Sequence, residues 1–520
     1  ICEKILAEDA DHVDALYVLG WIAFGRKDLR TALDHFQRVI KLKPDHARAH
    51  NNIGTVLMTA GNAIAAGRHL EAAVAADPNF TEAYNNLGAV RLTQNEPNAA
   101  RAAFEKAAAL APNDPGTLNN LGSVKLRLGD ADGAIAEFKK ALSARPDLAE
   151  AHNNLANAYR RKGLLEDAVA SLGRGLEAAP DSPELLCNLG VIHYELGDYE
   201  AALGDYDRAL AAHSDHRRSA YMRTFPLLAL GRFGEGWAAY LNRPGVRKTE
   251  SGLHRQPLAA DLGQTTIVLR SEGEAYEDLE FLRFVPELAR RGATVRIGAA
   301  SNLTALALTM DGIDSVAPEG GADGVLDVAL GDLPYLLGVN APGDLPPPAR
   351  FAADASHTQS TAARLNASGK GPFIGITWRR ATRSGAINVP IDRLAGALSG
   401  VQGTIVMLQQ GAGSDVLGRI QAASSLPVVD FSDVLDDMLG SLSLFSLLDH
   451  YVCVPGTGLY LRQAVGREAD ILVPEPPDYR FAGSNPTSPW FPGCRLHRAA
   501  RGADWAPALT SLSGALAQAH

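Results

Sequence analysis

The chain has 520 residues, which is too many for a single hydrophobic core, so two or three domains are expected. It is 46% hydrophobic and 21% charged, as in ordinary globular proteins. A net charge of −10 at pH 7 and an isoelectric point near 5.8 argue against nucleic acid as the main partner. Four widely spaced cysteines, no signal peptide and no long apolar run predict a cytoplasmic protein without a membrane span.

The first part of the chain repeats every 34 residues over about 13–216. A small residue in each of two helical segments and a closing proline recur at this interval, which is typical of tetratricopeptide repeats. The chain opens in what reads as the end of such a repeat, so we expect the natural protein to extend upstream. An aberrant unit at 217–243 is expected to cap the array.

One asparagine recurs at the same place in five successive repeats. Position-matched residues share a face of the array, so we expect these amides to form a row on its concave side. An amide donates and accepts like a peptide bond, so such a row suits an extended polypeptide. The alternative is that the amides bond to neighbouring helices and stiffen the array. The predicted acceptor-binding residues are Asn52, Asn86, Asn120, Asn154 and Asn188. Acids four residues before this position, at Asp14, Glu82, Glu150 and Glu184, favour a partner segment with some Lys or Arg.

From about residue 262, short β-branched runs alternate with helical segments, which predicts parallel α/β sheets. A proline-rich stretch at 339–351 separates two such series. We therefore expect an α-solenoid over 1–243, a first Rossmann-like half over 244–350 and a second over 351–520. The expected strands are 265–270, 294–299 and 324–330, then 372–378, 403–409, 426–431, 451–456 and 470–476.

Candidate ligand-binding residues lie at the ends of strands in the second half. The segment 451–466 runs from a strand through a glycine turn into a helix, whose first N–H groups suit a phosphate. Arginines after the first strand of this half could supply counter-charge. A plain turn and solvated loop residues are the competing interpretations. The candidates are Arg379, Arg383, Gln409, Gly456, Thr457 and Gly458.

Five carboxylates crowd the turn and helix start that follow the first strand of the first half. One of them could act as a general base. Acid enrichment at a helix N-terminus explains most of them without any catalysis. They are Glu272, Glu274, Glu277, Asp278 and Glu280. No Asp-x-Asp cluster follows a suitable strand, so no metal is expected.

Several segments, in order, resemble landmarks of bacterial tetratricopeptide-repeat glycosyltransferases with a C-terminal GT-B domain. They are GRFGEGWAAYLNR, EGEAYEDLEFLRFVPELARRGATV, GITWR, VPGTGLYLRQAVG, PPDYRF and SPWFPGCRLHR. The nearest architecture is that of alphaproteobacterial flagellin O-glycosyltransferases. In these, repeats dock flagellin and the GT-B domain transfers a nonulosonic acid from a CMP donor. The resemblance implies a nucleotide-sugar substrate without a cofactor, Asp278 as general base, and Tyr460 beside the donor. The neighbouring Glu274 and Glu277 are alternative bases, because all three lie within one turn of the strand end.

The chain also departs from this family. Pro455-Gly456 stands where the family has an Asp-Thr or Asn-Thr pair, Tyr460 replaces a histidine, and Glu277 replaces a glycine. These changes indicate a different donor, a different base or lost activity. We expect a metal-independent protein O-glycosyltransferase acting on Ser or Thr. The alternatives are N-acetylglucosamine transfer from a UDP sugar and a non-catalytic adaptor with a decayed transferase domain.

Overall fold

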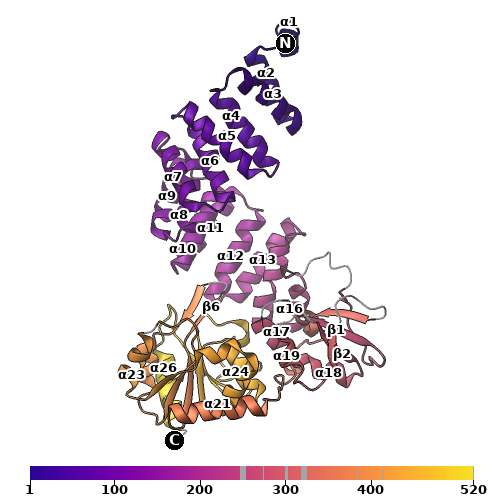
Figure 1. Ribbon diagram of the computed structural model, residues 1–520, viewed down its shortest axis with the longest axis vertical. Helices are drawn as coiled ribbons and strands as arrows, with labels where there is room; N and C mark the ends of the chain where they lie inside the picture. The colour runs from indigo at the N-terminus through magenta and orange to yellow at the C-terminus, as the bar shows by residue number, and fades with distance from the viewer. Residues whose placement is uncertain are drawn as a thin grey trace. The chain divides into compact units, whose positions relative to one another are not determined.

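The computed structural model describes residues 1–245, 253–272, 275–298, 303–317, 325–382, 385–413 and 415–518 (Figure 1). The chain divides into two compact units, residues 1–192 and 193–520. Each unit has its own internal contacts and is described separately.

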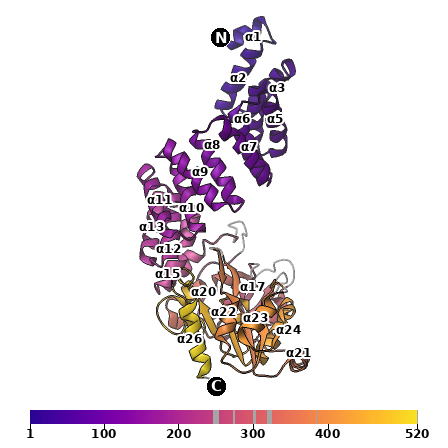
Figure 2. The ribbon, with the colours of Figure 1, turned by 90° about the vertical axis from the view of Figure 1, so that its left-hand side faces the viewer.

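The first unit is a stack of antiparallel helix pairs (Figure 2), which confirms the predicted α-solenoid. Its helices are α1 Cys2–Glu8, α2 Val13–Gly25, α3 Leu29–Leu42, α4 Ala47–Thr59, α5 Ala63–Ala76, α6 Thr81–Thr93, α7 Pro97–Leu110, α8 Pro115–Arg127, α9 Ala131–Ala144, α10 Ala149–Arg161, α11 Leu165–Ala178 and α12 Pro183–Leu196. The last of these helices runs across the boundary between the units. Successive first helices of the pairs, from α2 to α10, also contact one another, which places them on the inner side of the stack.

The recurring small residues let the two helices of a pair approach closely. A Cβ atom added to Gly88 would lie 2.6 Å from the ring of Phe104, and one added to Gly122 would lie 2.6 Å from the ring of Phe138. Both rings are almost fully buried. The predicted role of the repeat glycines therefore follows from direct contact, because any larger residue would displace a core aromatic ring.

The second unit begins with helices that continue the helical pattern. They are α13 Tyr199–Ala212, α14 Arg217–Met222, α15 Thr224–Ala229 and α16 Phe233–Tyr240. The break between α14 and α15 lies at Arg223, because Pro226 has no N–H with which to bond the Met222 carbonyl. Phe233, Trp237 and Tyr240 are buried in a hydrophobic core that also contains residues from both sheets.

The first sheet has four parallel strands in the order β3-β2-β1-β4. The strands are β1 Thr266–Arg270, β2 Thr294–Gly298, β3 Ser315–Ala317 and β4 Val325–Ala329. The helical segments are α17 Ala275–Phe281, η1 Leu282–Phe284, α18 Val285–Arg290, α19 Thr304–Ala307, η2 Leu330–Asp332, α20 Leu333–Leu336 and η3 Pro342–Asp344. The three predicted strands are present, and the short edge strand β3 is additional.

The second sheet has six parallel strands in the order β12-β11-β10-β5-β8-β9. The strands are β5 Phe373–Thr377, β8 Thr404–Met407, β9 Val428–Asp430, β10 His450–Cys453, β11 Asp470–Val473 and β12 Arg495–Arg498. An antiparallel hairpin, β6 Arg379–Thr382 and β7 Gly385–Asn388, follows β5. The helical segments are α21 Ala355–Ser368, α22 Ile391–Ala397, α23 Val416–Ser424, η4 Ser432–Asp436, α24 Met438–Leu447, α25 Thr457–Ala464, η5 Tyr479–Phe481 and α26 Ala506–Ala517. All five predicted strands are present. The two parallel sheets confirm the prediction of an α/β region after the repeats.

Candidate functional site

The predicted asparagine row is largely engaged in bonds between neighbouring repeats. At the α4–α6 junction, Asn86 Nδ2 donates to Asn51 Oδ1 at 2.8 Å, and Asn51 Nδ2 donates to Glu82 Oε1 at 3.0 Å. Asn51 is almost fully buried. Its amide therefore binds two groups of the next first helix at once and fixes that helix against its own.

The same arrangement recurs two repeats later. At the α8–α10 junction, Asn154 Nδ2 donates to Asn119 Oδ1 at 2.9 Å, and Asn119 Nδ2 donates to Glu150 Oε1 at 3.1 Å. Asn188 donates to Asn153 Oδ1 at 2.6 Å, and Asn52 donates to the Tyr17 hydroxyl at 3.2 Å. Four of the five predicted acceptor-binding residues thus bond to neighbouring helices, as the stiffening alternative requires.

Asn120 differs from the other four members of the row. Within the described residues it has no hydrogen-bond partner, and its side chain is partly exposed. The asparagine that would bond to it by analogy, Asn85, instead donates to Thr117 Oγ1 at 2.6 Å. Asn120 is therefore the member of the row whose amide remains available to a partner.

The carboxylates of the first-half loop are mostly used inside the fold. Glu272 accepts two hydrogen bonds from Arg243, at 2.8 and 2.6 Å, and a third from the Gly331 N–H at 3.1 Å. Arg243 also donates to the fully buried Asp332 at 2.6 Å. Burial lowers the pKa of Arg243, but its bonds to Glu272 outweigh burial and raise the pKa above its usual range. These contacts join the end of α16 to the loop after β1.

Asp278, the predicted general base, lies on α17 and is only 2% exposed. Its carboxylate accepts a hydrogen bond from the Ser271 hydroxyl and one from the Glu272 N–H at 3.4 Å. Here the carboxylate closes the loop between β1 and α17. Glu274, the second predicted catalytic residue, lies outside the described residues, and so does the side chain of Glu277. The assignment of a base stays a prediction.

Several predicted ligand-binding residues meet at the carboxyl edge of the second sheet. Gln409 Oε1, beyond β8, accepts hydrogen bonds from the backbone N–H groups of Trp378 at 3.2 Å and Arg379 at 2.9 Å, beyond β5. The exposed Arg379 side chain donates to the Gly411 carbonyl at 2.9 Å. This edge collects the ends of β5, β8 and β10 because those strands are neighbours and parallel. Arg383 lies outside the described residues.

The glycine turn lies at the same edge. Arg380 Nη1 donates to the Pro455 carbonyl at 3.1 Å, next to Gly456, and α25 begins at Thr457. A Cβ added to Gly456 would meet nothing closer than 3.7 Å, so there is space beside it. Gly458 faces inward instead, because a Cβ there would lie 2.4 Å from the Tyr451 hydroxyl oxygen. Gly458 therefore serves the packing of α25 rather than an open anion site.

Tyr460 lies on α25 in a buried polar cluster between the two halves. Its hydroxyl donates to Glu280 Oε2 at 3.1 Å, and the Tyr479 hydroxyl donates to Glu280 Oε1 at 3.1 Å. Arg480 donates to the same carboxylate, through Nε at 2.8 Å and through Nη2, and also binds Asp478. Burial lowers the pKa of Arg480, but Asp478 and Glu280 outweigh it and raise the pKa well above its usual value. This cluster holds α17 against α25 and η5.

Sequence reasoning treated Glu280 as one of five helix-start acids and missed this cluster. Its partners Tyr479 and Arg480 are 199 and 200 residues away in the chain, so no local pattern reveals the contact. The available signal was the position of Glu280 between Leu279 and Phe281, both buried. A charged residue in such a run requires a buried partner.

Two cavities border the cluster. The smaller, of about 10 Å³, is lined by Glu280, Arg283 and Tyr460 among others, and holds one water molecule at most. The larger, of about 610 Å³, lies between the α15–α16 turn and the 482–493 loop, with Tyr479 and Arg480 in its wall. Arg379, Gln409 and the glycine turn line neither cavity.

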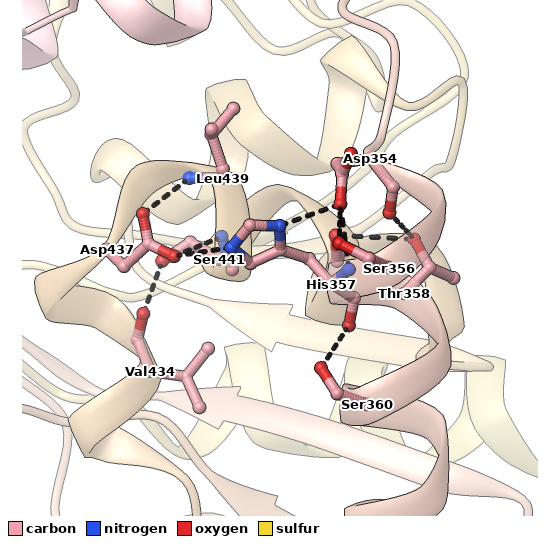
Figure 3. Close-up of polar contacts among 11 residues, drawn as sticks. Asp354, Ser356, His357, Thr358, Ser360, Val434, Asp437, Leu439 and Ser441 are labelled. Carbon is pink, nitrogen blue, oxygen red and sulfur yellow. Dashed lines mark hydrogen bonds and ion pairs between the residues drawn. The ribbon is translucent and has the colours of Figure 1, made fainter.

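Another polar cluster joins the N-termini of α21 and α24 (Figure 3). Asp354 caps α21 and accepts from the His357 ring at 2.8 Å, while the other ring nitrogen lies 3.7 Å from Asp437, which caps α24. Hydrogen bonds from Ser356 and His357 lower the pKa of Asp354. The cluster lies at the surface and ties the helix after the proline-rich stretch to the second sheet.

Across the described part of the chain, no helix combines the length and apolarity needed to cross a bilayer. The same residues contain no group of three or more His, Cys, Asp or Glu side chains placed to hold a metal ion.

Comparison with known proteins bears on the first unit and its continuation. Models of tetratricopeptide repeats match residues 3–47, 17–79 and 51–115, residues 125–186, and residues 183–216. The repeats are tetratricopeptide repeats. Repeats of this kind are associated with binding other proteins, which points to protein–protein interaction as the role of the array. No curated protein sequence matches the chain.

Solved structures align to the repeats. MamA is 27% identical over 32% of this chain and 92% of its own, with a TM-score of 0.30. YrrB, described as a TPR protein with an unusual peptide-binding site, is 22% identical over 35% of this chain and 95% of its own, with a TM-score of 0.31. The Cut9–Hcn1 tetramer of the APC/C gives 18% identity over 44% of this chain and 45% of its own, with a TM-score of 0.39. These low scores add nothing on function.

Proposed function

We propose that this chain is a protein O-glycosyltransferase. The tetratricopeptide repeats hold an acceptor protein, and the α/β region, a GT-B domain in this proposal, transfers a sugar to one of its Ser or Thr residues. In its finer form, by the resemblance described above, the acceptor is flagellin and the donor is a CMP-linked nonulosonic acid. A UDP-linked N-acetylglucosamine is the alternative donor.

The transfer is a displacement at the anomeric carbon of the donor. The acceptor oxygen forms the new bond to that carbon, and the nucleotide phosphate leaves with the bonding electrons. The hydroxyl proton passes to a carboxylate acting as general base. Cationic side chains and backbone N–H groups stabilise the charge of the departing phosphate.

The observation that carries this proposal is the polar edge of the second sheet. Arg379 and Gln409 contact each other there, and Arg380 bonds the carbonyl beside Gly456 at the start of α25. Guanidinium groups and the first N–H groups of a helix both favour an anion. A nucleotide phosphate beside Gly456 would have both within reach, together with open space for its oxygens.

A specific observation favours a second candidate function, a non-catalytic adaptor. Glu272, Asp278 and Glu280 are all bonded inside the fold, and Asp278 and Glu280 are buried. A base must reach the acceptor hydroxyl. If neither Glu274 nor Glu277 supplies it, the α/β region binds without catalysing.

The transferase requires a nucleotide site, which is tested by the thermal stabilisation of the full chain by CMP and by UDP. Gly456→Asp adds bulk and negative charge where the phosphate is proposed, and we expect it to abolish the stabilisation. Gly400→Asp adds the same group at an exposed turn with nothing within 4 Å and should leave it unchanged. Arg379→Ala should weaken binding by loss of charge. Wild-type protein that neither nucleotide stabilises would reject the transferase and leave the adaptor.

Acceptor docking is tested by titrating purified flagellin against single asparagine variants. Asn120→Ala should weaken binding without changing stability, because Asn120 has no hydrogen-bond partner within the described residues. Asn154→Ala is the matched control, and it should lower stability because it removes the bond to Asn119. Unchanged flagellin affinity in Asn120→Ala would contradict recognition by this residue.

A further inference from the structure

The bonds between successive first helices follow a pattern with three parts. At the α4–α6 and α8–α10 junctions the central residue is a buried asparagine, Asn51 or Asn119. Its side-chain oxygen accepts a hydrogen bond from an asparagine amide of the next first helix, and its own amide donates one to a glutamate of that helix. A hydroxyl, of Thr55 or Ser123, also lies within 3.5 Å of the donated amide. Both junctions are therefore held by directional bonds with defined geometry.

The α6–α8 junction lies between these two and lacks both supporting groups. By the 34-residue register, Gly116 takes the place of Glu82 and Glu150, and Ala89 takes the place of Thr55 and Ser123. Among the residues that the structure describes, none donates a hydrogen bond to the buried Oδ1 of Asn85. The contact between α6 and α8 is also smaller than that between α4 and α6 or between α8 and α10, and is as small as that between α2 and α4.

One buried polar bond crosses this junction, from Asn85 Nδ2 to Thr117 Oγ1 at 2.6 Å, and the rest of the contact is mainly apolar. Phe104 packs against Leu121 and Val124, and Arg127 donates to Asn95 at 2.7 Å near the surface. Apolar contacts are not directional, so helices held mainly by them, with fewer buried polar bonds than the α4–α6 and α8–α10 junctions, tilt at a lower cost. The unsatisfied buried oxygen of Asn85 also makes tight packing of α6 against α8 less favourable than packing at the neighbouring junctions.

We infer that the α6–α8 junction is a hinge within the repeat array. The segment before it and the segment after it, each stiffened by an asparagine–glutamate triad, pivot about the Phe104 contact. The array thereby changes the curvature of its inner face at this position, while the flanking α4–α6 and α8–α10 junctions stay rigid.

The test uses spin labels on the full chain with Cys2 replaced by Ser. Ala102, Ala136 and Ala170 are exposed residues at equivalent places on α7, α9 and α11. Labels at Ala102→Cys and Ala136→Cys span the hinge, and labels at Ala136→Cys and Ala170→Cys span the triad-held α8–α10 junction. The first pair should give the broader distance distribution. Equal widths would overturn the inference.

Restoring the missing groups tests the cause. Ala89→Ser with Gly116→Glu should narrow the hinge distribution and slow hydrogen exchange of α6 and α8 amides about fivefold, the effect of one recovered hydrogen bond. Ala89→Ser with Gly116→Ala is the control, since it adds helix propensity without the carboxylate. If the control narrows the distribution as much as the restored pair, the missing triad is not what makes the junction flexible.

Discussion

Removing the Glu280 charge is expected to destabilise the second unit strongly. Glu280→Gln keeps the shape of the side chain but leaves Arg480 buried with Asp478 as its remaining acid, and Asp478 is 43% exposed. Breaking a buried ion pair from one side costs about 3–5 kcal/mol. The retained Asp478 places the expected loss near the lower end, at about 3 kcal/mol.

Urea unfolding followed by tryptophan fluorescence measures this loss. Trp237, Trp378, Trp490 and Trp505 are buried in the second unit, whereas Trp21 in the first unit is 63% exposed, so the signal reports mainly the second unit. Glu235→Gln is the matched control: its partner is Arg232 at the surface, and the urea midpoint should not move. Arg480→Met added to Glu280→Gln should recover part of the loss. Equal, small effects of Glu280→Gln and Glu235→Gln would refute the reasoning.

Three further outcomes are expected. Gly458→Ala should lower the thermal midpoint, because its Cβ would meet Tyr451 and Phe445. Gly456→Ala should leave the midpoint unchanged, because Gly456 has an extended φ and open space beside it. Equal midpoints for the two variants would contradict the packing role of Gly458. Burial, and then the adjacent His50, lower the pKa of His69 below 6.5 in the folded chain. As the pH falls below 6.5, the unfolded chain therefore takes up a proton at His69 more readily than the folded chain does, and the free energy of unfolding decreases. His69→Gln should flatten that slope in circular dichroism melts. A fragment of residues 1–182 should be helical and monodisperse by size-exclusion chromatography, whereas 1–243 should aggregate, because it exposes Phe233, Trp237 and Tyr240.

Periodicity was enough to predict the solenoid and most strands, because each depends on residues close together in the chain. The 34-residue interval located the helix pairs, and β-branched runs located β1, β2, β4 and five strands of the second sheet. The strands β3 and β12 gave too little signal: Ser315–Ala317 has three residues, and Arg495–Arg498 is mostly polar. Their pairing depends on neighbours distant in sequence.

The candidate sites were less predictable because they depend on which polar groups satisfy each other. The row of asparagines was evident, but its preceding neighbours, such as Asn51 and Asn119, are the buried partners that occupy most of it. The sequence does contain a signal for these partners, because pairs of adjacent asparagines recur every 34 residues. The contact between Glu280 and Arg480 had no such signal, because it forms only when the two halves fold together.

The shared core of α14–α16 and the two sheets has a consequence for recombination of this protein. Phe233, Trp237 and Tyr240 pack with residues such as Phe281 and Trp490, and Arg243 binds Glu272 and Asp332. A chimera that grafts a foreign array onto the α/β region at residue 243 would therefore lose part of that region's interior. A junction for exchanging repeats therefore belongs upstream of α14, so that these helices stay with the sheets that complete their core.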